Sequence, residues 1–481
     1  MANKPVDLVE MYEGSIPLKP EYSPFNEAAF RILDTLYLHL ESTPKNSKTT
    51  KRGKAYALFL SSFLAVSQRL SFIDKGVIAI PEDSHYWRQF DGVGWQIKEN
   101  IVQDLIKASF ITRVPFSGKR YIWQDDHGLW QSQGVLTQFH LNDSLLNLAD
   151  FVEATWISTG RTEILISKAE TIPQKKRREQ EGRKRKKLTS KEVQRVLNKR
   201  DYKTYTKLAN GVRKLNRFWR DHPLILPPDG NGYSIHCASA TRVFHNGSIK
   251  SGGRYYGEWT NLEGWVRRRA TIDGEATVQI DLNASQPTLF SSLMGFKMNV
   301  GGLWKDLYDI VVEPLDGENK SAKAKQVAME LIGTGNPYKK APASDCKIDF
   351  NREELAVDEE GNTLDEYGIY RHRLLEVVPA LAELNSEYLN GAGYLSYHEA
   401  EIMRLSLEKL LSIGVPAYPV HDCLITKISN QDVVLQTYRN TLSKYVLKES
   451  SKRGDTPINL VAPVSIEANG TKKRIAGYYI E

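Results

Sequence analysis

Two short apolar segments each end in an aspartate, and this pair of aspartates constrains the chain more than any other feature. Asp281 follows the residues VQI, and Asp422 follows the residues PVH. A carboxylate at the end of a strand or in a turn can face solvent while its apolar neighbours are buried. Two such carboxylates brought together in the fold can hold a pair of Mg²⁺ ions, as in-line phosphoryl transfer requires. The pair therefore suggests nucleotidyl transfer.

Each aspartate, taken alone, also has a purely structural explanation. An aspartate after a strand can cap a helix or form a turn, and Pro287 after Asp281 fits an ordinary helix start. The dipeptide His421-Asp422 suits the polar tip of a hairpin. The case for catalysis therefore depends on the features that accompany the two aspartates.

The composition is that of a globular protein. The 481 residues suffice for two or three domains, and 41% of them are hydrophobic. The three cysteines are isolated in the sequence, which favours a reducing compartment over a disulfide framework or a structural zinc site. The N-terminus lacks the apolar core of a signal peptide, and no apolar stretch approaches the ~18 residues of a membrane span. We expect a cytoplasmic protein that contacts no membrane.

The N-terminal part has helical periodicity followed by a strand pattern. Residues 24–70 predict two helices and residues 95–108 a third, and residues 110–114 and 119–123 predict two strands joined by a hairpin turn. A helix followed by a basic hairpin resembles a winged-helix module that contacts nucleic acid. Small helix–hairpin units without affinity for DNA have the same pattern and remain the alternative.

A basic segment divides the chain. Gln174–Lys187 holds nine Lys and Arg residues against two Glu, and such a charge density resists burial. It would bind phosphates with salt-sensitive affinity, or it is a solvated run that touches nothing. We expect an N-terminal helical, winged-helix-like region over residues 1–173, a basic linker with a connecting helix over 174–232, and a chemistry-bearing region over 233–481.

The third region mixes strands and helices. We expect a strand at 277–282 that runs into a helix at 287–293, and two strands, 415–420 and 424–428, that meet at His421-Asp422. Helices are also expected at 321–331, 371–389 and 398–411, and a solvated acidic excursion at 351–366.

Five segments occur in an informative order. Residues 252–256 read GGRYY, 260–263 read TNLE, 267–272 read RRRATI, 281–293 read DLNASQPTLFSSL, and 420–423 read VHDC. This order resembles the family A DNA polymerases and the single-subunit phage and mitochondrial RNA polymerases. In that family a T-G-R loop and N-L-Q precede an arginine-rich strand, then D-Y-S-x-x-E-x-R, and finally V-H-D-E. The resemblance spans roughly residues 240 to 430.

The resemblance implies an α+β fold with a right-hand polymerase core, in which an antiparallel palm sheet carries helical fingers and thumb. It implies that Asp281 and Asp422 bridge two Mg²⁺ ions, for which Mn²⁺ can substitute, with the Leu282 carbonyl as a further ligand. Lys325 would neutralise the transferring phosphates. Nucleotide-binding roles are implied for Gln286, Lys320, Lys323 and Lys325.

The resemblance also implies contacts with nucleic acid. Arg254 would clamp the backbone together with Arg267, Arg268 and Arg269, and Tyr255 or Tyr256 would stack on a base or sugar. His421 would lie against the primer terminus; the alternative is that it holds its turn by hydrogen bonds. A supporting role near the nascent pair is implied for His398, Glu399 and Glu401, but an acidic helix N-terminus is the simpler explanation of the two glutamates.

Three departures from the family pattern leave alternatives open. Gln286 replaces a glutamate that helps to exclude the ribose 2′-OH, and Cys423 replaces the glutamate after the second aspartate. In the fingers helix, Ser321 and Met329 replace an arginine and an aromatic residue, and Lys320 or Lys323 would have to supply the missing charge. A single-subunit RNA polymerase or primase therefore remains possible, as does a nucleic-acid-binding replication initiator whose palm is inactive.

The expected function is that of a DNA polymerase without proofreading, encoded by a bacterial host, a phage, a plasmid or another mobile element. Its partners would be a primer-template of DNA, or alternatively RNA, nucleoside triphosphates, and a helicase or other replication proteins. We expect it in the cytoplasm of the bacterial host.

Overall fold

The structure, a computed structural model, describes residues 16–18, 21–44, 50–71, 77–82, 87, 93–115, 117, 120–124, 130–134, 136–158, 163–180, 185–227, 235–344, 346–358, 361–385, 391–452, 457–468 and 470–480. Two compact units are present: Met1–Glu163 with Trp219–Thr241, and Ile164–Phe218 with Arg242–Glu481. These boundaries differ from the predicted ones. One reason is that β9 (Ile164–Ile166) pairs in parallel with β12 (Thr241–Phe244), which joins the chain around Ile164 to the second unit.

In the first unit, the three predicted helices are present as α2 (Glu27–His39), α3 (Lys51–Ser71) and α5 (Trp95–Lys107). Asn26 caps α2 by accepting a hydrogen bond from the Ala29 amide, at 3.0 Å. Apolar faces of these helices form one core with strands of the unit. One sheet has the strand order β1 (Ile16–Pro17), β3 (Val77–Ala79), β7 (Gln138–Leu141) and β4 (Ile111–Arg113). Four further strands pair in the order β10 (Leu224–Ile225), β11 (His236–Cys237), β8 (Trp156–Ser158) and β2 (Tyr22–Pro24). The unit also contains the short helix α6 (Asp143–Leu146).

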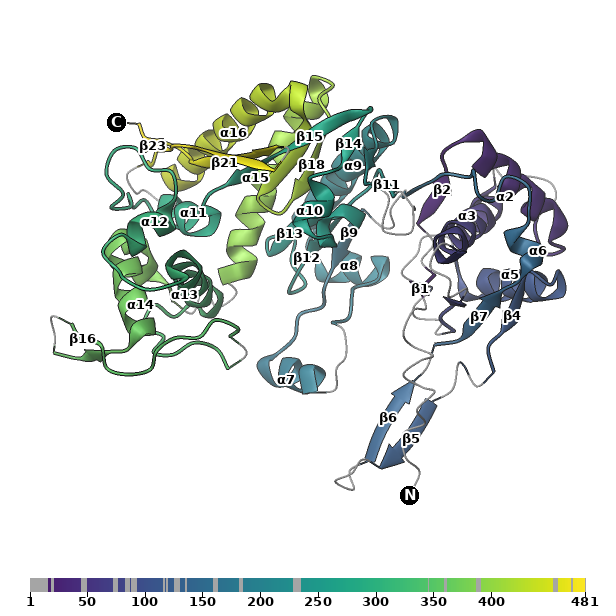
Figure 1. Ribbon diagram of the computed structural model, residues 1–481, viewed down its shortest axis with the longest axis horizontal. Helices are drawn as coiled ribbons and strands as arrows, with labels where there is room; N and C mark the ends of the chain where they lie inside the picture. The colour runs from purple at the N-terminus through teal and green to yellow at the C-terminus, as the bar shows by residue number, and fades with distance from the viewer. Residues whose placement is uncertain are drawn as a thin grey trace. The chain divides into compact units, whose positions relative to one another are not determined.

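The predicted hairpin between residues 110–114 and 119–123 is wrong. β4 pairs with β7, and β5 (Arg120–Gln124) pairs with β6 (Trp130–Gly134) as a separate two-stranded ribbon (Figure 1). Buried Ile111 lies opposite buried Leu141, so the apolar strand finds its partner beyond the ribbon instead of in the next strand. The winged-helix role of this region remains a prediction.

The centre of the second unit is an antiparallel sheet. Its strands are ordered β18 (Ala417–Val420), β19 (Cys423–Lys427), β15 (Glu275–Leu282), β21 (Val464–Ala468) and β22 (Thr471–Ile475). β14 (Thr271–Ile272) pairs with the start of β15. Along β15, Val278 and Ile280 are fully buried whereas Gln279 and Asp281 are partly exposed, as the alternation of a strand requires. The predicted strands and the turn between β18 and β19 are confirmed.

Helices cover this sheet. α15 (Gly391–Ser412) and α16 (Gln431–Ser451) lie side by side against it, and α11 (Ser285–Leu293) contacts both of them (Figure 1). The fingers-like segment forms α13 (Lys320–Thr334), which contacts α12 (Leu307–Val312) and α14 (Glu366–Val377).

Two predicted helices have different bounds. The helix predicted at 371–389 begins earlier and ends at Val377, and a 3-10 helix, η2 (Pro379–Glu383), follows it. Pro379 explains the ending, because a proline disfavours helical backbone in the residue before it; Val378 has φ −124° and ψ 73°. Residues 386–389 lie outside the described residues. The helix predicted at 398–411 is the longer α15.

The predicted basic linker is largely helical, with α7 (Ile172–Gln180), α8 (Ser190–Val196) and α9 (Lys199–Asp221). Within it, Arg178 and Arg185 both pair with Glu170, at 3.0 and 3.4 Å. The basic run therefore touches its own unit at these positions. The remaining elements are β13 (Gly252–Tyr256), η1 (Glu258–Asn261), α10 (Gly264–Arg267), β16 (Ala356–Val357), β17 (Thr363–Leu364), η4 (Ile428–Asn430), β20 (Leu460–Val461) and β23 (Tyr478–Tyr479).

Among the described residues, none of the helices combines the length and the apolar character needed to cross a membrane.

Candidate active site

The pairing of β15 with β19 brings the two aspartates together. Asp281 lies directly opposite Cys423 in the ladder, and Asp422 precedes Cys423 in the turn from β18 to β19. The Leu282 amide donates a hydrogen bond to the Asp422 carbonyl at 3.4 Å, and the Tyr438 hydroxyl donates to the same carbonyl at 2.7 Å. The turn is therefore anchored on both sides, with its carboxylate beside that of Asp281.

The two carboxylates influence each other electrostatically. Burial, and then the negative charge of Asp422, raise the pKa of Asp281 to about 7, whereas the charges of Lys472 and Lys325 lower it. A buried pair of like charges is costly unless a cation joins it. Lys325 therefore lies close enough to act on Asp281, and so does Lys472, which the sequence analysis did not single out.

The donor set fits a magnesium ion. No group of three or more His, Cys, Asp or Glu side chains suited to a metal is present among the described residues. However, Mg²⁺ is usually bound by one or two carboxylates together with substrate phosphates and water, not by a complete protein cage. Asp281 and Asp422 supply two neighbouring carboxylates, which meets that requirement.

Ser285 and Glu399 extend the site. The Ser285 hydroxyl oxygen lies 2.6 Å from Asp422 Oδ2 and 2.8 Å from Glu399 Oε1. Because a hydroxyl has one proton to donate, one of these contacts requires a proton on a carboxyl group. Burial raises the pKa of Glu399, and the charge of Arg254 offsets this only in part. Ser285 therefore links Glu399 to Asp422, and Arg254 pairs with the Glu399 carboxylate.

Glu399 and Glu401 lie well inside α15, so the simpler explanation as an acidic helix N-terminus is wrong. The sequence signal for Glu399 was weak, since its partners Ser285 and Arg254 come from distant segments.

β13 presents alternate side chains to the site. Arg254 forms an ion pair with Glu399, and the Tyr256 ring meets the His421 ring edge-on at 5.9 Å. Tyr255 points the other way and is only 2% exposed. The expectation that Tyr255 stacks on a base or sugar is therefore wrong, because the strand alternation buries it, whereas Tyr256 remains available.

His421 is held in the turn by backbone conformation. Its φ is 56°, in the left-handed region, and its buried Nδ1 has no hydrogen-bond partner among the described residues. Burial, and then the charge of Arg254, lower the pKa of the His421 imidazole, so the ring is neutral at neutral pH. The alternative that His421 holds its turn through hydrogen bonds finds no support at Nδ1.

The three predicted arginines lie at the end of a short helix, not on a strand. Arg267 is the last residue of α10 and donates a hydrogen bond to the Leu262 carbonyl. Arg268 pairs with Glu467 at 3.1 Å. Among the described residues, Arg269 is exposed and has no ion-pair partner, so it is the member of this cluster that is most available for a phosphate.

The three predicted lysines of α13 have different roles. Lys323 pairs with Glu366 at 2.6 Å, and Lys320 donates to the Leu315 carbonyl at 2.5 Å. Lys325 is exposed and acts on Asp281. Lys323 is therefore neutralised by an acid, whereas the Lys320 ammonium contacts a carbonyl. That one of them supplies the charge missing at Ser321 remains a prediction.

The hairpin of β21 and β22 adds a second cation. Gln279 lies opposite Glu467, which lies opposite Lys472. Paired residues of neighbouring strands point to the same face of a sheet, and Gln279 shares its face with Asp281. Lys472 is therefore on the face of the carboxylates. A basic run at 471–474 was visible in the sequence, but its register was not.

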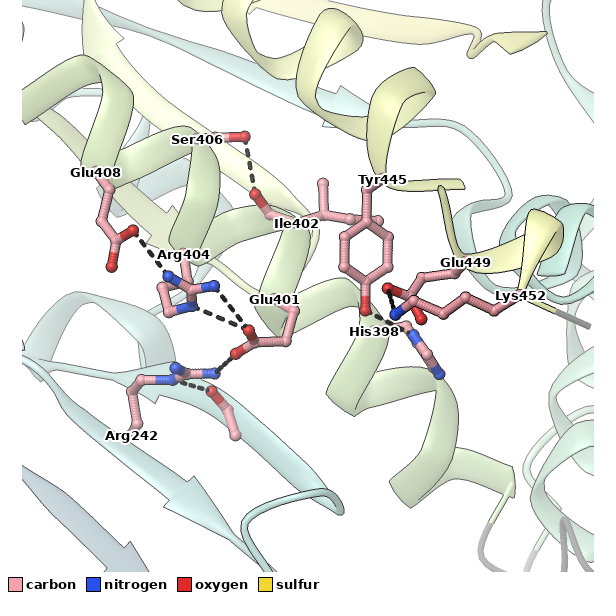
Figure 2. Close-up of polar contacts among 11 residues, drawn as sticks. Arg242, His398, Glu401, Ile402, Arg404, Ser406, Glu408, Tyr445, Glu449 and Lys452 are labelled. Atoms are coloured by element: carbon pink, nitrogen blue, oxygen red, sulfur yellow. Dashed lines mark hydrogen bonds and ion pairs between the residues drawn. The ribbon is translucent and has the colours of Figure 1, made fainter. Parts of the chain in front are cut away.

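The remaining predicted residues lie at the edge of the site. Leu282 ends β15 and is buried, and Gln286 is partly exposed in the first turn of α11. Cys423 is buried opposite Asp281, and burial raises the pKa of its thiol, so it is a core residue. The His398 Nδ1 lies 2.8 Å from the Tyr445 hydroxyl of α16 (Figure 2). Its supporting role near the nascent pair remains a prediction.

No model of a known protein family matches this chain, and no curated protein matches its sequence. Among solved structures, the POL domain of Pol1 from M. smegmatis, in complex with DNA primer-template and dNTP, is similar with a TM-score of 0.27 and 11% sequence identity. The match covers 51% of this chain and 49% of that one, so the chain spans about half the length of that domain. A likeness this distant identifies no activity, and the function is inferred from the site.

Proposed function

We propose that this chain catalyses template-dependent nucleotidyl transfer, as a DNA polymerase related to family A. One observation supports the proposal above the others. Asp281 and Asp422, from distant parts of the chain, meet on one antiparallel sheet, and burial together with Asp422 raises the pKa of Asp281 to about 7. Such a pair is stable with both carboxylates ionised only when cations join it.

Asp281 and Asp422 hold two Mg²⁺ ions in this proposal, and the Leu282 carbonyl is a further ligand. The ions, when bound, lower the pKa of a primer 3′-hydroxyl and stabilise the departing pyrophosphate. Ser285 fixes the orientation of the Asp422 carboxylate through its hydrogen bond, so the ligand geometry is set before substrate arrives. Preorganised ligands of this kind lower the barrier because no reorganisation is needed in the transition state.

Two lysines near the carboxylates suit a triphosphate. Lys325 comes from α13 and Lys472 from β22, and both lower the pKa of Asp281. In the proposal the sheet is the palm of a right-hand core and α13 belongs to the fingers. Lys325 then contacts the phosphates of the incoming nucleotide, next to Gln286 at the start of α11.

The primer lies beside Arg254, Tyr256 and His421 in the proposal. These three side chains adjoin Asp422: Arg254 acts electrostatically on His421, and the Tyr256 ring meets the His421 ring. A neutral imidazole and a phenol ring form a surface on which a sugar or base can rest. Exposed Arg269 would neutralise a backbone phosphate. The N-terminal unit would contribute nucleic-acid contacts without proofreading, in the replication of a phage, plasmid or other mobile element.

Primer extension tests the proposal. The purified chain is given a labelled primer annealed to a DNA template, dNTPs and Mg²⁺. Asp281→Asn and Asp422→Asn are each expected to slow extension by at least about a hundredfold, because a metal site is worth several kcal/mol in the transition state. Asp273→Asn is the matched control, since Asp273 is exposed in the β14–β15 turn and pairs with Lys427 at 3.1 Å.

The same assay separates the alternatives. Extension with NTPs, or on an unprimed template, would identify an RNA polymerase or primase instead. Binding of the primer-template without Mg²⁺-dependent extension would identify an initiator with an inactive palm. Unchanged extension by Asp281→Asn or Asp422→Asn would show that these carboxylates hold no catalytic metal.

A further inference from the structure

A groove between α15 and α16 lies apart from the carboxylates. Its volume is about 540 Å³, within the range of sites that hold a nucleotide-sized ligand. All of its lining residues belong to the second compact unit. They are Tyr397, His398, Glu401, Arg404, Leu405 and Lys409 of α15, Asn440, Thr441, Lys444, Tyr445, Lys448 and Glu449 of α16, and Lys452 just after α16.

The two acidic residues of the groove are already neutralised. Glu401 forms ion pairs with Arg242 at 3.0 Å and with Arg404 at 2.9 Å (Figure 2). Glu449 pairs with Lys452 at 2.6 Å. Neither carboxylate therefore has charge left to balance another lysine.

Three lysines in the groove are left without an ion-pair partner among the described residues. Lys444 and Lys448 are exposed one turn apart on α16, and exposed Lys409 is on α15. A solvated helix face often carries lysines that bind nothing. Here, however, the lysines come from both helices and line one concave surface, so their fields add at the same place. The groove is therefore suited to an anion that reaches across both helices.

Aromatic rings line the same groove. His398 is surrounded by Tyr394, Tyr397 and Tyr445, with ring centroids 4.5, 5.4 and 5.8 Å away. Tyr397 and Tyr445 are only partly buried and line the groove. Proteins that bind single-stranded nucleic acid without sequence preference combine two features. Lysines contact the phosphate backbone, and aromatic rings stack on the bases.

α15 separates this groove from the carboxylates. Glu399 bonds to Ser285 and Arg254 on one side of the helix, whereas His398 and Arg404 face the groove. We propose that the groove between α15 and α16 binds a single strand of nucleic acid, at a site distinct from that of Asp281 and Asp422. The proposal does not depend on catalysis.

The experiment compares two lysine pairs with the same spacing. Lys444→Glu with Lys448→Glu alters the groove, and Lys203→Glu with Lys207→Glu makes the same charge change on an exposed face of α9. Binding of a fluorescent oligothymidine strand is measured by anisotropy at several salt concentrations. We expect the groove pair to weaken binding at least about tenfold and to reduce the salt slope by about 1.4, since each phosphate contact on a single strand contributes about 0.7.

A footprint locates the contact. Acetylation of lysines, read by mass spectrometry, should be reduced by the strand at Lys444 and Lys448 but not at Lys203 and Lys207. Both measurements are made without dNTPs, so the result is independent of primer extension. Equal loss of affinity in both lysine pairs, no loss in the groove pair, or equal dependence on the groove for a blunt duplex would each overturn the proposal.

Discussion

Two glutamates of α15, two residues apart, lie in opposite electrostatic surroundings. Burial raises the pKa of Glu399, and Arg254 offsets this only in part. Burial acts in the same direction on Glu401, but the charges of Arg242 and Arg404 outweigh it and lower the pKa of that carboxyl. One carboxylate is fully compensated, and the other is not.

The difference corresponds to the two sides of the helix. On the side of Glu401, two arginines and Glu408 form a closed network that fixes α15 against β12 and β13 (Figure 2). On the side of Glu399, the chain leaves negative charge beside Asp281 and Asp422. A scaffold neutralises its buried charges, whereas a site that is to bind cations keeps some unneutralised.

The largest effect on stability is expected when the Arg242–Glu401 ion pair is removed. Arg242 is fully buried between the rings of Phe244 and Tyr255, at 4.9 and 5.1 Å, and bonds to Glu401. Arg242→Met should reduce the free energy of unfolding by about 3 to 5 kcal/mol, because it removes one partner of a buried ion pair. Urea denaturation measures the change. Adding Glu401→Gln should recover part of the loss, and two independent, additive losses would contradict the pairing.

On the uncompensated side, removal of a charge should stabilise the protein. The folded-state pKa of Asp281 is about 7, above its ordinary value of 3.8. The folded state therefore binds the proton more tightly, and the stability that this contributes is lost as pH rises from about 4 through 7. In EDTA, Asp281→Asn should raise the free energy of unfolding by roughly 1 to 3 kcal/mol at pH 8 and leave it unchanged below pH 4.

Denaturation across this pH range checks the prediction, with Asp273→Asn as the control. A stabilisation by Asp281→Asn that does not change with pH would mean that the carboxyl has an ordinary pKa and that its burial is compensated.

The cations around the uncompensated carboxylates should matter for activity more than for stability. Lys472→Ala is expected to slow primer extension about tenfold, equivalent to about 1.4 kcal/mol, because one partly solvated phosphate contact is lost. Lys473 is the matched control, since it lies opposite Ile466 and so points to the other face of β22. Equal effects of Lys472→Ala and Lys473→Ala on extension would remove Lys472 from the site.

The sequence predicted local features of this site well and tertiary ones poorly. The strand before Asp281 and the turn at His421 follow from alternation and turn chemistry within a few residues. Lys472 was missed because its position depends on the register of three strands. The Ser285–Glu399 contact joins residues 114 positions apart, and nothing local in either segment indicates it.

Errors in the fold have the same cause. The hairpin predicted after residue 110 assumed that neighbouring strands pair, whereas β4 pairs beyond the ribbon with β7. In contrast, the early end of α14 could have been predicted, because Pro379 was visible and a helix seldom continues through the residue before a proline.

The smallest effect is expected at Cys423, which the family resemblance marked as a departure. Cys423 follows Asp422 in the sequence and lies opposite Asp281 in the strand pairing. Its side chain is nevertheless buried in the core. Cys423→Ala should therefore leave primer extension within about threefold and cost about 1 kcal/mol of stability, the size of a small cavity. Thiol-directed alkylation of the folded chain should likewise spare this residue, because burial raises the pKa of the thiol and the thiolate is the reactive form.

A large loss of extension in Cys423→Ala, with stability retained, would instead place the thiol among the groups that touch the reacting atoms. The site would then include a thiolate sulfur ligand, and the oxygen-only donor set that favours Mg²⁺ would no longer describe it.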